Sequence, residues 1–179
     1  QERMAQTDSL TGAWTRGSFE YYIGQLLQSD SGRLFGLLYA DIDEFKAIND
    51  RYGHSEGDHA IRVFAETAKR VLRKGDAIAR VGGDEFAILI NVDSQESLEA
   101  VTARIDSELA LYNRTSGKPY ALTCSIGAEM FRQTSDCRVD DLIRRVDWLM
   151  YCKKHEKKGE PSETPKAPVE KRGLAKPAS

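Results

Sequence analysis

Apolar residues recur along the chain with two different spacings, and these spacings divide it into strands and helices. Short apolar runs rich in β-branched residues predict strands at residues 34–42, 77–81, 86–92 and 120–130. Apolar residues at helical spacing predict helices at residues 16–28, 44–51, 58–72, from 93–94 through 109, and 139–157. Thr15 can cap the first helix, and residues 53–57 are expected to form a tight turn before the third.

The predicted order of elements is helix, strand, helix pair, hairpin, helix, strand, helix. This order predicts an α+β sandwich in which helices flank a mostly antiparallel sheet, with a ferredoxin-like β-α-β-β-α-β core. A chain of 179 residues fits one domain, which we place at residues 7–158. Residues 1–6 are expected to end an upstream helix. Residues 159–179 are rich in Pro, Lys, Glu, Ser and Ala and are expected to form a disordered tail.

Composition and charge exclude several classes of protein. The net charge of −2 gives no overall basic field for nucleic acid or anionic lipid. No apolar run approaches the ~20 residues of a transmembrane helix, and no signal peptide is visible. The cysteines, at positions 124, 137 and 152, lack metal-ligand spacing, so we expect thiols in a reducing, cytoplasmic compartment. The first residues look like the middle of a longer chain, which leaves a membrane anchor open.

Acidic residues follow two of the predicted strands. Asp41 and Asp43 close the strand at 34–42, and Asp84 and Glu85 follow the pair Gly82–Gly83 in the predicted hairpin. Carboxylates from two strand ends suit Mg²⁺ and a phosphate, and glycines can take positive φ or let a ligand approach closely. Neighbours on a strand point to opposite faces, so at most one of Asp84 and Glu85 faces a given site unless the turn distorts. The alternative is an ordinary turn with solvated acids.

Residues 82–86 read Gly-Gly-Asp-Glu-Phe and resemble the signature of the GGDEF family, the diguanylate cyclases. Other family motifs have matches in the same order, at residues 8–12 (D-x-L-T-G), 41–50 (D-I-D-x-F-K-x-I-N-D), 52–58 (Y-G-H-x-x-G-D), 125–127 (S-I-G) and 147–154 (the last helix). The resemblance covers roughly residues 7 to 158. It implies the fold of nucleotide cyclase catalytic domains and polymerase palms.

The activity implied by this resemblance is condensation of two GTP molecules to cyclic di-GMP with release of two pyrophosphates. Each domain offers half a site, so the resemblance also implies a homodimer, promoted by a missing N-terminal sensory or regulatory domain. Mg²⁺ is the implied cofactor, with Mn²⁺ as an alternative ion. Asp41, the Ile42 carbonyl and Asp84 match the metal ligands. Asp84 also matches the residue described as general base, and Glu85 is a further motif acid with no assigned role.

The resemblance assigns the remaining positions to substrate and product. Substrate-binding positions are Phe45, Lys46, Asn49, His54, Asp58 and Lys154. Among them Asn49 and Asp58 match guanine contacts, and Lys46 and Lys154 match phosphate contacts, with backbone N–H groups near Phe45 as additional donors. Arg73 and Asp76 match an inhibitory product site, to which Arg104 could add a contact.

Simpler interpretations of these residues remain open. Asn49 could cap the end of a helix and Asp58 the start of one, Lys154 could be a solvated charge, and Arg73 with Asp76 could form a helix-end ion pair. A non-catalytic module that binds GTP or cyclic di-GMP is the alternative function. A generic nucleotide cyclase or polymerase palm is disfavoured by the Asn49–Asp58 pair and by Arg73-x-x-Asp76.

Overall fold

A five-stranded sheet forms the centre of the computed structural model, which describes residues 6–159. The strands lie in the order β1-β3-β4-β2-β5. Their bounds are Trp14–Thr15 (β1), Leu34–Ile42 (β2), Ala77–Arg80 (β3), Glu85–Asn91 (β4) and Cys124–Arg132 (β5). Only the β1–β3 pair is parallel among the described pairings, and every other pair is antiparallel. The four longer strands have the predicted ferredoxin-like connectivity.

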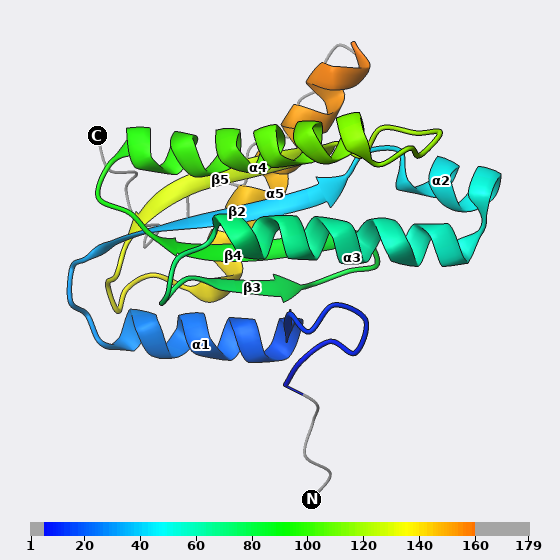
Figure 1. Ribbon diagram of the computed structural model, residues 1–179. Coiled ribbons are helices and arrows are strands. Elements are labelled where there is room, and N and C mark those ends of the chain that lie inside the picture. Colours follow the sequence, from blue (N-terminus) through cyan, green and yellow to red (C-terminus); the bar gives the residue numbers. More distant parts are fainter. Residues whose placement is uncertain (1–5, 160–179) are drawn as a thin grey trace, which may run out of the picture.

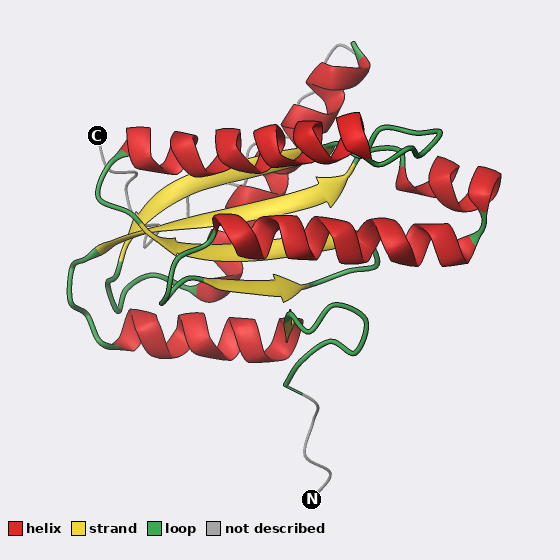
Figure 2. Cartoon of the chain, in the orientation of Figure 1, coloured by secondary structure: helices red, strands yellow, loops and turns green. Residues whose placement is uncertain are grey.

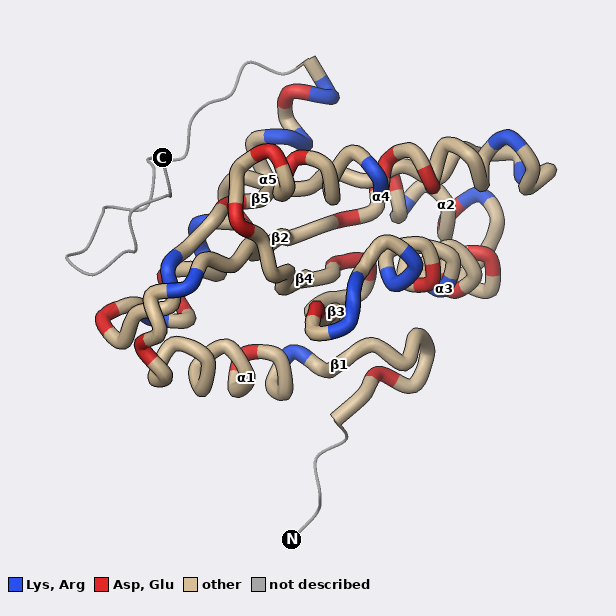
Figure 3. The backbone as a smooth tube through the Cα atoms, turned by 60° about the vertical axis from the view of Figure 1, so that its left-hand side comes forward, with Lys and Arg blue, Asp and Glu red and all other residues tan. Residues whose placement is uncertain are grey.

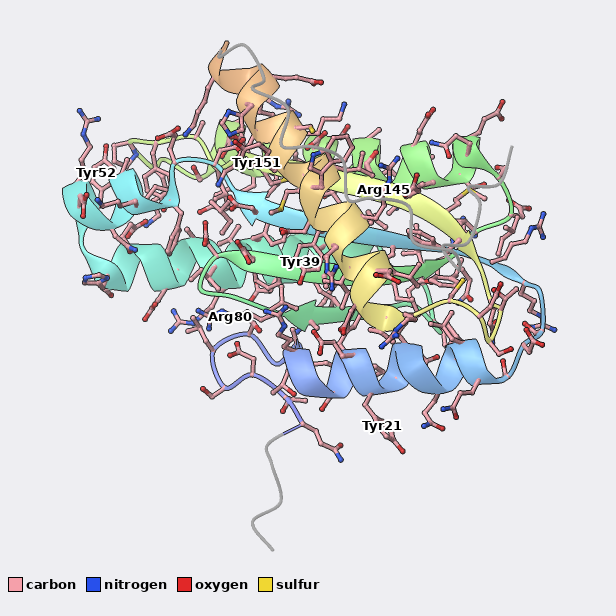
Figure 4. All side chains as sticks on the ribbon, turned by 180° about the vertical axis from the view of Figure 1, so that it is seen from behind. Tyr21, Tyr39, Tyr52, Arg80, Arg145 and Tyr151 are labelled. Atoms are coloured by element: carbon pink, nitrogen blue, oxygen red, sulfur yellow. The ribbon has the colours of Figure 1, made fainter. Side chains whose placement is uncertain are left out.

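Four of the five helices cover the two faces of this sheet, and the short α2 lies beyond its end (Figures 1 and 2). Their bounds are Arg16–Gln28 (α1), Phe45–Tyr52 (α2), His54–Val71 (α3), Gln95–Thr115 (α4) and Val139–Lys158 (α5). Helices α3 and α4 pack on one face, and α1 and α5 on the other, where α5 crosses in front of the strands in the view of Figure 4. The α+β class and the antiparallel, helix-flanked sheet are therefore confirmed.

Strand β2 explains why both faces need cover. It is buried from Phe35 to Ile42. Its side chains alternate, so Phe35, Leu37 and Tyr39 enter the core under α1 and α5, whereas Leu38, Ala40 and Ile42 enter the core under α3 and α4. A continuous apolar run is what a strand buried on both faces requires. Both bounds of this strand match the prediction.

Helix α5 approaches the sheet most closely at Gly127 on β5. A Cβ at this position would overlap the backbone nitrogen of Met150 and the carbonyl oxygen of Val146. Only a glycine lets the helix backbone lie directly against the strand.

Two local predictions were wrong, and one short strand was missed. Residues 53–57 do not form a turn, because Gly53 (φ 88°) ends α2 and α3 begins at once at His54. The last strand begins at Cys124 instead of residue 120, because residues 116–123 are held by side-chain contacts outside the sheet. The short strand β1 was not expected. The helix expected at 1–6 and the tail expected at 159–179 fall outside the described residues, apart from Gln6 and Gly159.

No helix within residues 6–159 has both the length and the apolar character needed to cross a membrane.

Gly127→Ala should destabilise the protein strongly, because the new methyl group meets helix backbone that cannot rotate away. We expect the free energy of unfolding, measured with urea, to fall by about 3 kcal/mol. Gly17→Ala is the matched control: it adds the same methyl group in α1, where nothing lies within 4 Å, and should stabilise by about 0.5 kcal/mol or more. Equal effects of the two changes would contradict the close-packing argument.

Candidate active site

The acidic ends of β2 and β4 meet at one edge of the sheet. The antiparallel register pairs Asp41 with Glu85, and the backbone N–H of Ile42 donates to the carbonyl oxygen of Asp84 at 3.2 Å. Figure 3 shows the acidic positions of the two strands side by side. Sheet pairing thus brings the pair Asp41–Ile42 beside the pair Asp84–Glu85, and these two pairs lie more than forty positions apart in the sequence.

The hairpin turn at residues 81–84 is fixed by Arg80 and by its own backbone. The N–H of Val81 donates to the Glu85 carbonyl oxygen at 2.9 Å, and the Arg80 guanidinium donates twice to the Gly83 carbonyl oxygen, at 2.8 and 3.0 Å. Neither Gly82 nor Gly83 takes a left-handed φ, so the backbone conformation does not require glycine at either position. A Cβ on Gly82 would lie 2.9 Å from the Glu85 carboxylate, whereas a Cβ on Gly83 would face open space.

Arg80 also joins this turn to the D-x-L-T-G segment at residues 8–12. Its Nη1 lies 3.3 Å from Asp8 Oδ1, and Asp8 accepts hydrogen bonds from the N–H and hydroxyl of Thr11 at 2.9 and 2.8 Å. Partial burial alone would raise the pKa of Asp8, but the Thr11 hydrogen bonds and the charge of Arg80 hold it below its ordinary value. The sequence prediction missed Arg80, although its place directly before the turn was visible.

Asp41 is buried, with 4% of its surface exposed. Its Oδ2 accepts a hydrogen bond from Lys154 Nζ at 2.7 Å. Its Oδ1 is buried and has no hydrogen-bond partner among the described residues. Burial raises the pKa of Asp41 to about 6, with Lys154 opposing the shift and Asp84 adding to it. An unpartnered buried carboxylate oxygen beside further acids fits a hard cation such as Mg²⁺.

Asp43 has a different role, because its carboxylate is fully engaged. Its oxygens accept hydrogen bonds from Ser125 Oγ at 2.6 Å, Thr123 Oγ1 at 2.7 Å and Lys157 Nζ at 2.8 Å. Burial opposes ionisation here, but these donors outweigh it and lower the pKa of Asp43. Asp43 therefore holds β5 and the end of α5 to the end of β2.

Glu85 is half-buried, and its pKa is raised by burial first and then by the nearby Asp147 and Asp84. Within residues 6–159 no three His, Cys, Asp or Glu side chains form a closed metal cluster. Mg²⁺ commonly binds through one or two carboxylates and completes its shell with substrate phosphates and water. Asp41, Asp84 and the Ile42 carbonyl lie at one edge of the sheet and could provide ligands of this kind.

The corner between α2 and α3 carries Asn49, His54 and Asp58. The interpretation of Asn49 and Asp58 as helix caps is wrong, because Gly53 occupies the junction and Asp58 is the fifth residue of α3. Gly57 lets the Asn49 amide lie against α3, since a Cβ there would overlap Asn49 Oδ1. The side chains of Asn49 and Asp58 have no hydrogen-bond or ion-pair partner in the described part of the chain, so both can meet a ligand.

Helix α2 begins directly beyond the acidic strand end. Its N-cap residue, Glu44, has a left-handed backbone (φ 52°, ψ 33°) and makes no side-chain capping bond. A non-glycine residue in this region is uncommon and costs energy. The first N–H groups of a helix have no intrahelical acceptor, so those at Phe45 and Lys46 can serve a phosphate oxygen. The Lys46 side chain is exposed.

A pocket of about 640 Å³ lies near the Asn91 end of β4, away from the acidic edge at Glu85. Arg73, Asp76 and Arg104 all line it, together with Arg33, which the sequence prediction missed and which no local pattern marks. Asp76 does not pair with the Arg73 guanidinium. Its Oδ2 instead accepts the backbone N–H of Arg73 at 2.8 Å and its Oδ1 that of Asn91 at 3.0 Å. The pocket therefore presents arginine side chains beside a carboxylate that holds the turn.

Both the fold and the sequence of this chain are similar to those of known proteins. The fold is similar to the crystal structure of the GGDEF domain of DgcB from Caulobacter crescentus in complex with c-di-GMP, with TM-score 0.76 and 27% identity over 89% of this chain and 95% of that chain. An acidic edge on an α+β sheet of this topology defines a nucleotide-cyclase-like domain. The family model described as "Diguanylate cyclase, GGDEF domain" matches residues 5–160. The chain belongs to the GGDEF family.

Two curated relatives contain a similar domain within a longer chain. The chain is 34% identical over 164 residues to cyclic di-GMP phosphodiesterase PdeR of Escherichia coli (strain K12), covering 89% of this chain and 24% of PdeR. It is 36% identical over 155 residues to diguanylate cyclase DgcP of Pseudomonas aeruginosa, covering 84% of this chain and 23% of DgcP. The chain thus spans about a quarter of the length of these relatives.

The raised pKa of Asp41 predicts that its ionisation opposes folding when no metal is bound. Because the folded-state pKa is about 6 against an ordinary value of 3.8, the folded protein holds this proton more tightly, and stability falls as the pH rises through about 6. Asp41→Asn should therefore raise the free energy of unfolding by about 2 kcal/mol at pH 8 in EDTA, with little change at pH 4. Urea unfolding measures this. Asp136→Asn, an exposed acid in a turn, is the control, and a less stable Asp41→Asn variant at pH 8 would contradict the argument.

Proposed function

We propose that this chain is the catalytic domain of a diguanylate cyclase, which condenses two GTP molecules to cyclic di-GMP and releases two pyrophosphates. The observation that carries the proposal is the buried, unpartnered Oδ1 of Asp41 at the edge it shares with Asp84. A buried acceptor of this kind is costly unless a ligand completes it. Membership of the family supports the same reaction.

Asp41, Asp84 and the Ile42 carbonyl would hold Mg²⁺, or Mn²⁺ in its place. When bound, the metal would neutralise phosphate charge and acidify the attacking hydroxyl. Lys154 balances the charge of Asp41 through Oδ2 and leaves Oδ1 for the metal. Glu85 is the neighbouring acid, and its raised pKa makes it a candidate to hold a proton near the reacting hydroxyl.

Asn49 and Asp58 would select guanine. A carboxylate can accept hydrogen bonds from guanine N1–H and the exocyclic amine, and an amide can pair with O6 or N3. Adenine offers the wrong pattern to this pair. His54, exposed as the first residue of α3, would add a substrate contact, and the N–H groups at Phe45 and Lys46 would receive phosphate oxygens.

One chain offers one GTP site, so catalysis would take place between two domains that face each other. The 3′-hydroxyl of each GTP would attack the α-phosphate of the other, and the protein would contribute mainly positioning and charge stabilisation. A regulatory domain in the full-length protein would control this pairing. The proposed compartment is the cytoplasm. The similarity to PdeR, named as a phosphodiesterase, favours the alternative of a non-catalytic GTP-binding or cyclic di-GMP-binding module.

Product formation from GTP and Mg²⁺ should rise more steeply than linearly with protein concentration, because the active species is a dimer. Asp84→Ala should lower the rate at least 100-fold through loss of a metal ligand. Asp136→Ala, which removes an exposed acid from the turn before α5, should leave the rate unchanged. If the unaltered chain binds GTP but forms no cyclic di-GMP at any concentration, either the binding-module alternative is correct or catalysis requires the regulatory domain.

We also propose that cyclic di-GMP inhibits the enzyme by binding the pocket lined by Arg73, Asp76 and Arg104. Arginine can form paired hydrogen bonds with guanine O6 and N7 or with phosphate. Because Asp76 holds the backbone N–H of Arg73, Arg73→Ala should leave the turn intact.

Arg73→Ala should raise the inhibitory concentration of cyclic di-GMP about tenfold or more, since it removes a charged hydrogen-bond donor. The initial rate without added product should stay unchanged. Arg62→Ala, an exposed arginine on α3 that does not line this pocket, is the control. Unaltered inhibition in Arg73→Ala would place the inhibitory site elsewhere.

A further inference from the structure

The segment between α4 and β5, residues 116–123, is held to three separate parts of the molecule. Asn113 on α4 anchors it, because its amide donates to the Leu122 carbonyl oxygen at 2.9 Å and accepts the Leu122 N–H at 2.8 Å. At its far end Thr123 contacts Asp43 through both backbone and side chain, with distances of 2.9 and 2.7 Å. Asp43 lies two residues beyond Asp41, so this end of the segment is fixed to the acidic edge.

The other end of the segment holds the α2–α3 corner through Glu56. The Glu56 carboxylate accepts a hydrogen bond from the Tyr120 hydroxyl at 2.7 Å and pairs with Lys118 Nζ at 2.8 Å. The ring of Tyr120 packs on that of Tyr52 with centroids 5.3 Å apart, and the Tyr52 hydroxyl points to the Pro119 carbonyl oxygen at 3.4 Å. Hydrogen bonds from Lys118 and Tyr120 lower the pKa of Glu56, which keeps its carboxylate charged.

These contacts lie beside the residues that are proposed to bind the guanine base. Glu56 lies on α3 between His54 and Asp58, and Tyr52 ends α2, the helix that carries Asn49. The segment runs beside α2 at one end of the sheet (Figure 1). It therefore connects the acidic edge, through Asp43, with the α2–α3 corner, through Glu56.

The α3 side of the corner is anchored by buried residues such as Ala60 and Ile61, whereas the α2 side has few core contacts. Helix α2 has eight residues, of which only Ile48 is buried, and it enters through the left-handed Glu44 without a capping side chain. A short helix with one buried side chain has low intrinsic stability. A displacement of about 1 Å at a substrate-positioning element can change a rate by orders of magnitude.

We propose that Glu56 and Tyr120 are positioning residues that fix the α2–α3 corner relative to the acidic edge, so that guanine and triphosphate of one GTP are held at the required separation. The inference rests on the proposed function, since it takes Asn49 and Asp58 as the guanine contacts. Neither Glu56 nor Tyr120 touches the nucleotide in this proposal.

The experiment measures binding of 3′-deoxyguanosine triphosphate, which cannot be condensed, and of its inosine analogue, which lacks the exocyclic amine. Tyr120→Phe keeps the ring on Tyr52 but removes the hydrogen bond, and Glu56→Gln removes the charge. Each should weaken binding of the guanine nucleotide about fivefold to tenfold, because loss of this internal charge-assisted hydrogen bond lowers the fraction of molecules whose corner is in the binding position. The inosine nucleotide should lose less affinity than the guanine nucleotide, because it already lacks one of the two hydrogen bonds to Asp58.

Tyr112→Phe is the matched control. It removes the same hydroxyl from a neighbouring tyrosine, which bonds His59 on α3 at 3.2 Å instead of Glu56, and should leave both affinities unchanged. Guanine binding within twofold of the unaltered chain in both corner variants would overturn the proposal. Equal losses for guanine and inosine nucleotides, or an equal effect of Tyr112→Phe, would also overturn it by indicating general destabilisation.

The measurement separates this proposal from the proposed reaction. A chain that binds the guanine nucleotide with the expected pattern of variants but makes no cyclic di-GMP would support the positioning role and refute the catalytic one. A chain that binds neither nucleotide would overturn both.

Discussion

The antiparallel register of β2 against β4 is the constraint on which the rest of the site depends. Because Asp41 faces Glu85 across this pairing, a single ladder of backbone hydrogen bonds gathers negative charge at one edge of the sheet. A one-residue slip would turn every side chain of β2 to the other face and place its large apolar groups in the wrong core. The two apolar cores that protect the register therefore also position the acids.

This arrangement is energetically unfavourable for the Asp41 carboxylate. Burial removes its carboxylate from water, and Lys154 compensates only one of its two oxygens. Two positions along the chain, Asp43 has a complete set of donors and contributes to holding the fold together. The contrast separates two uses of neighbouring aspartates: one is satisfied within the protein, and the other keeps an oxygen for a ligand.

Much of the fold could be predicted because its strongest signals are local. Strand β2 was predicted in full, since a strand buried on both faces is apolar throughout. The α2–α3 junction was predicted as a turn because Gly53 and Gly57 resemble turn residues, whereas Gly57 serves to admit the Asn49 amide. The contact between Glu56 and Tyr120 joins residues 64 positions apart, so no local pattern could indicate it. Motif residues were easy to find, but the residues that hold them in place were not.

Gly127 has an effect that reaches beyond packing. It sets how deeply α5 sits on the sheet at Val146 and Met150, and Lys154 lies one helical turn, about 6 Å, further along the same helix. The depth at which α5 docks therefore decides whether the Lys154 ammonium reaches Asp41. A glycine in the core therefore controls the charge balance of the acidic edge. A larger residue at position 127 would move α5 outward and separate the Lys154 ammonium from the Asp41 carboxylate.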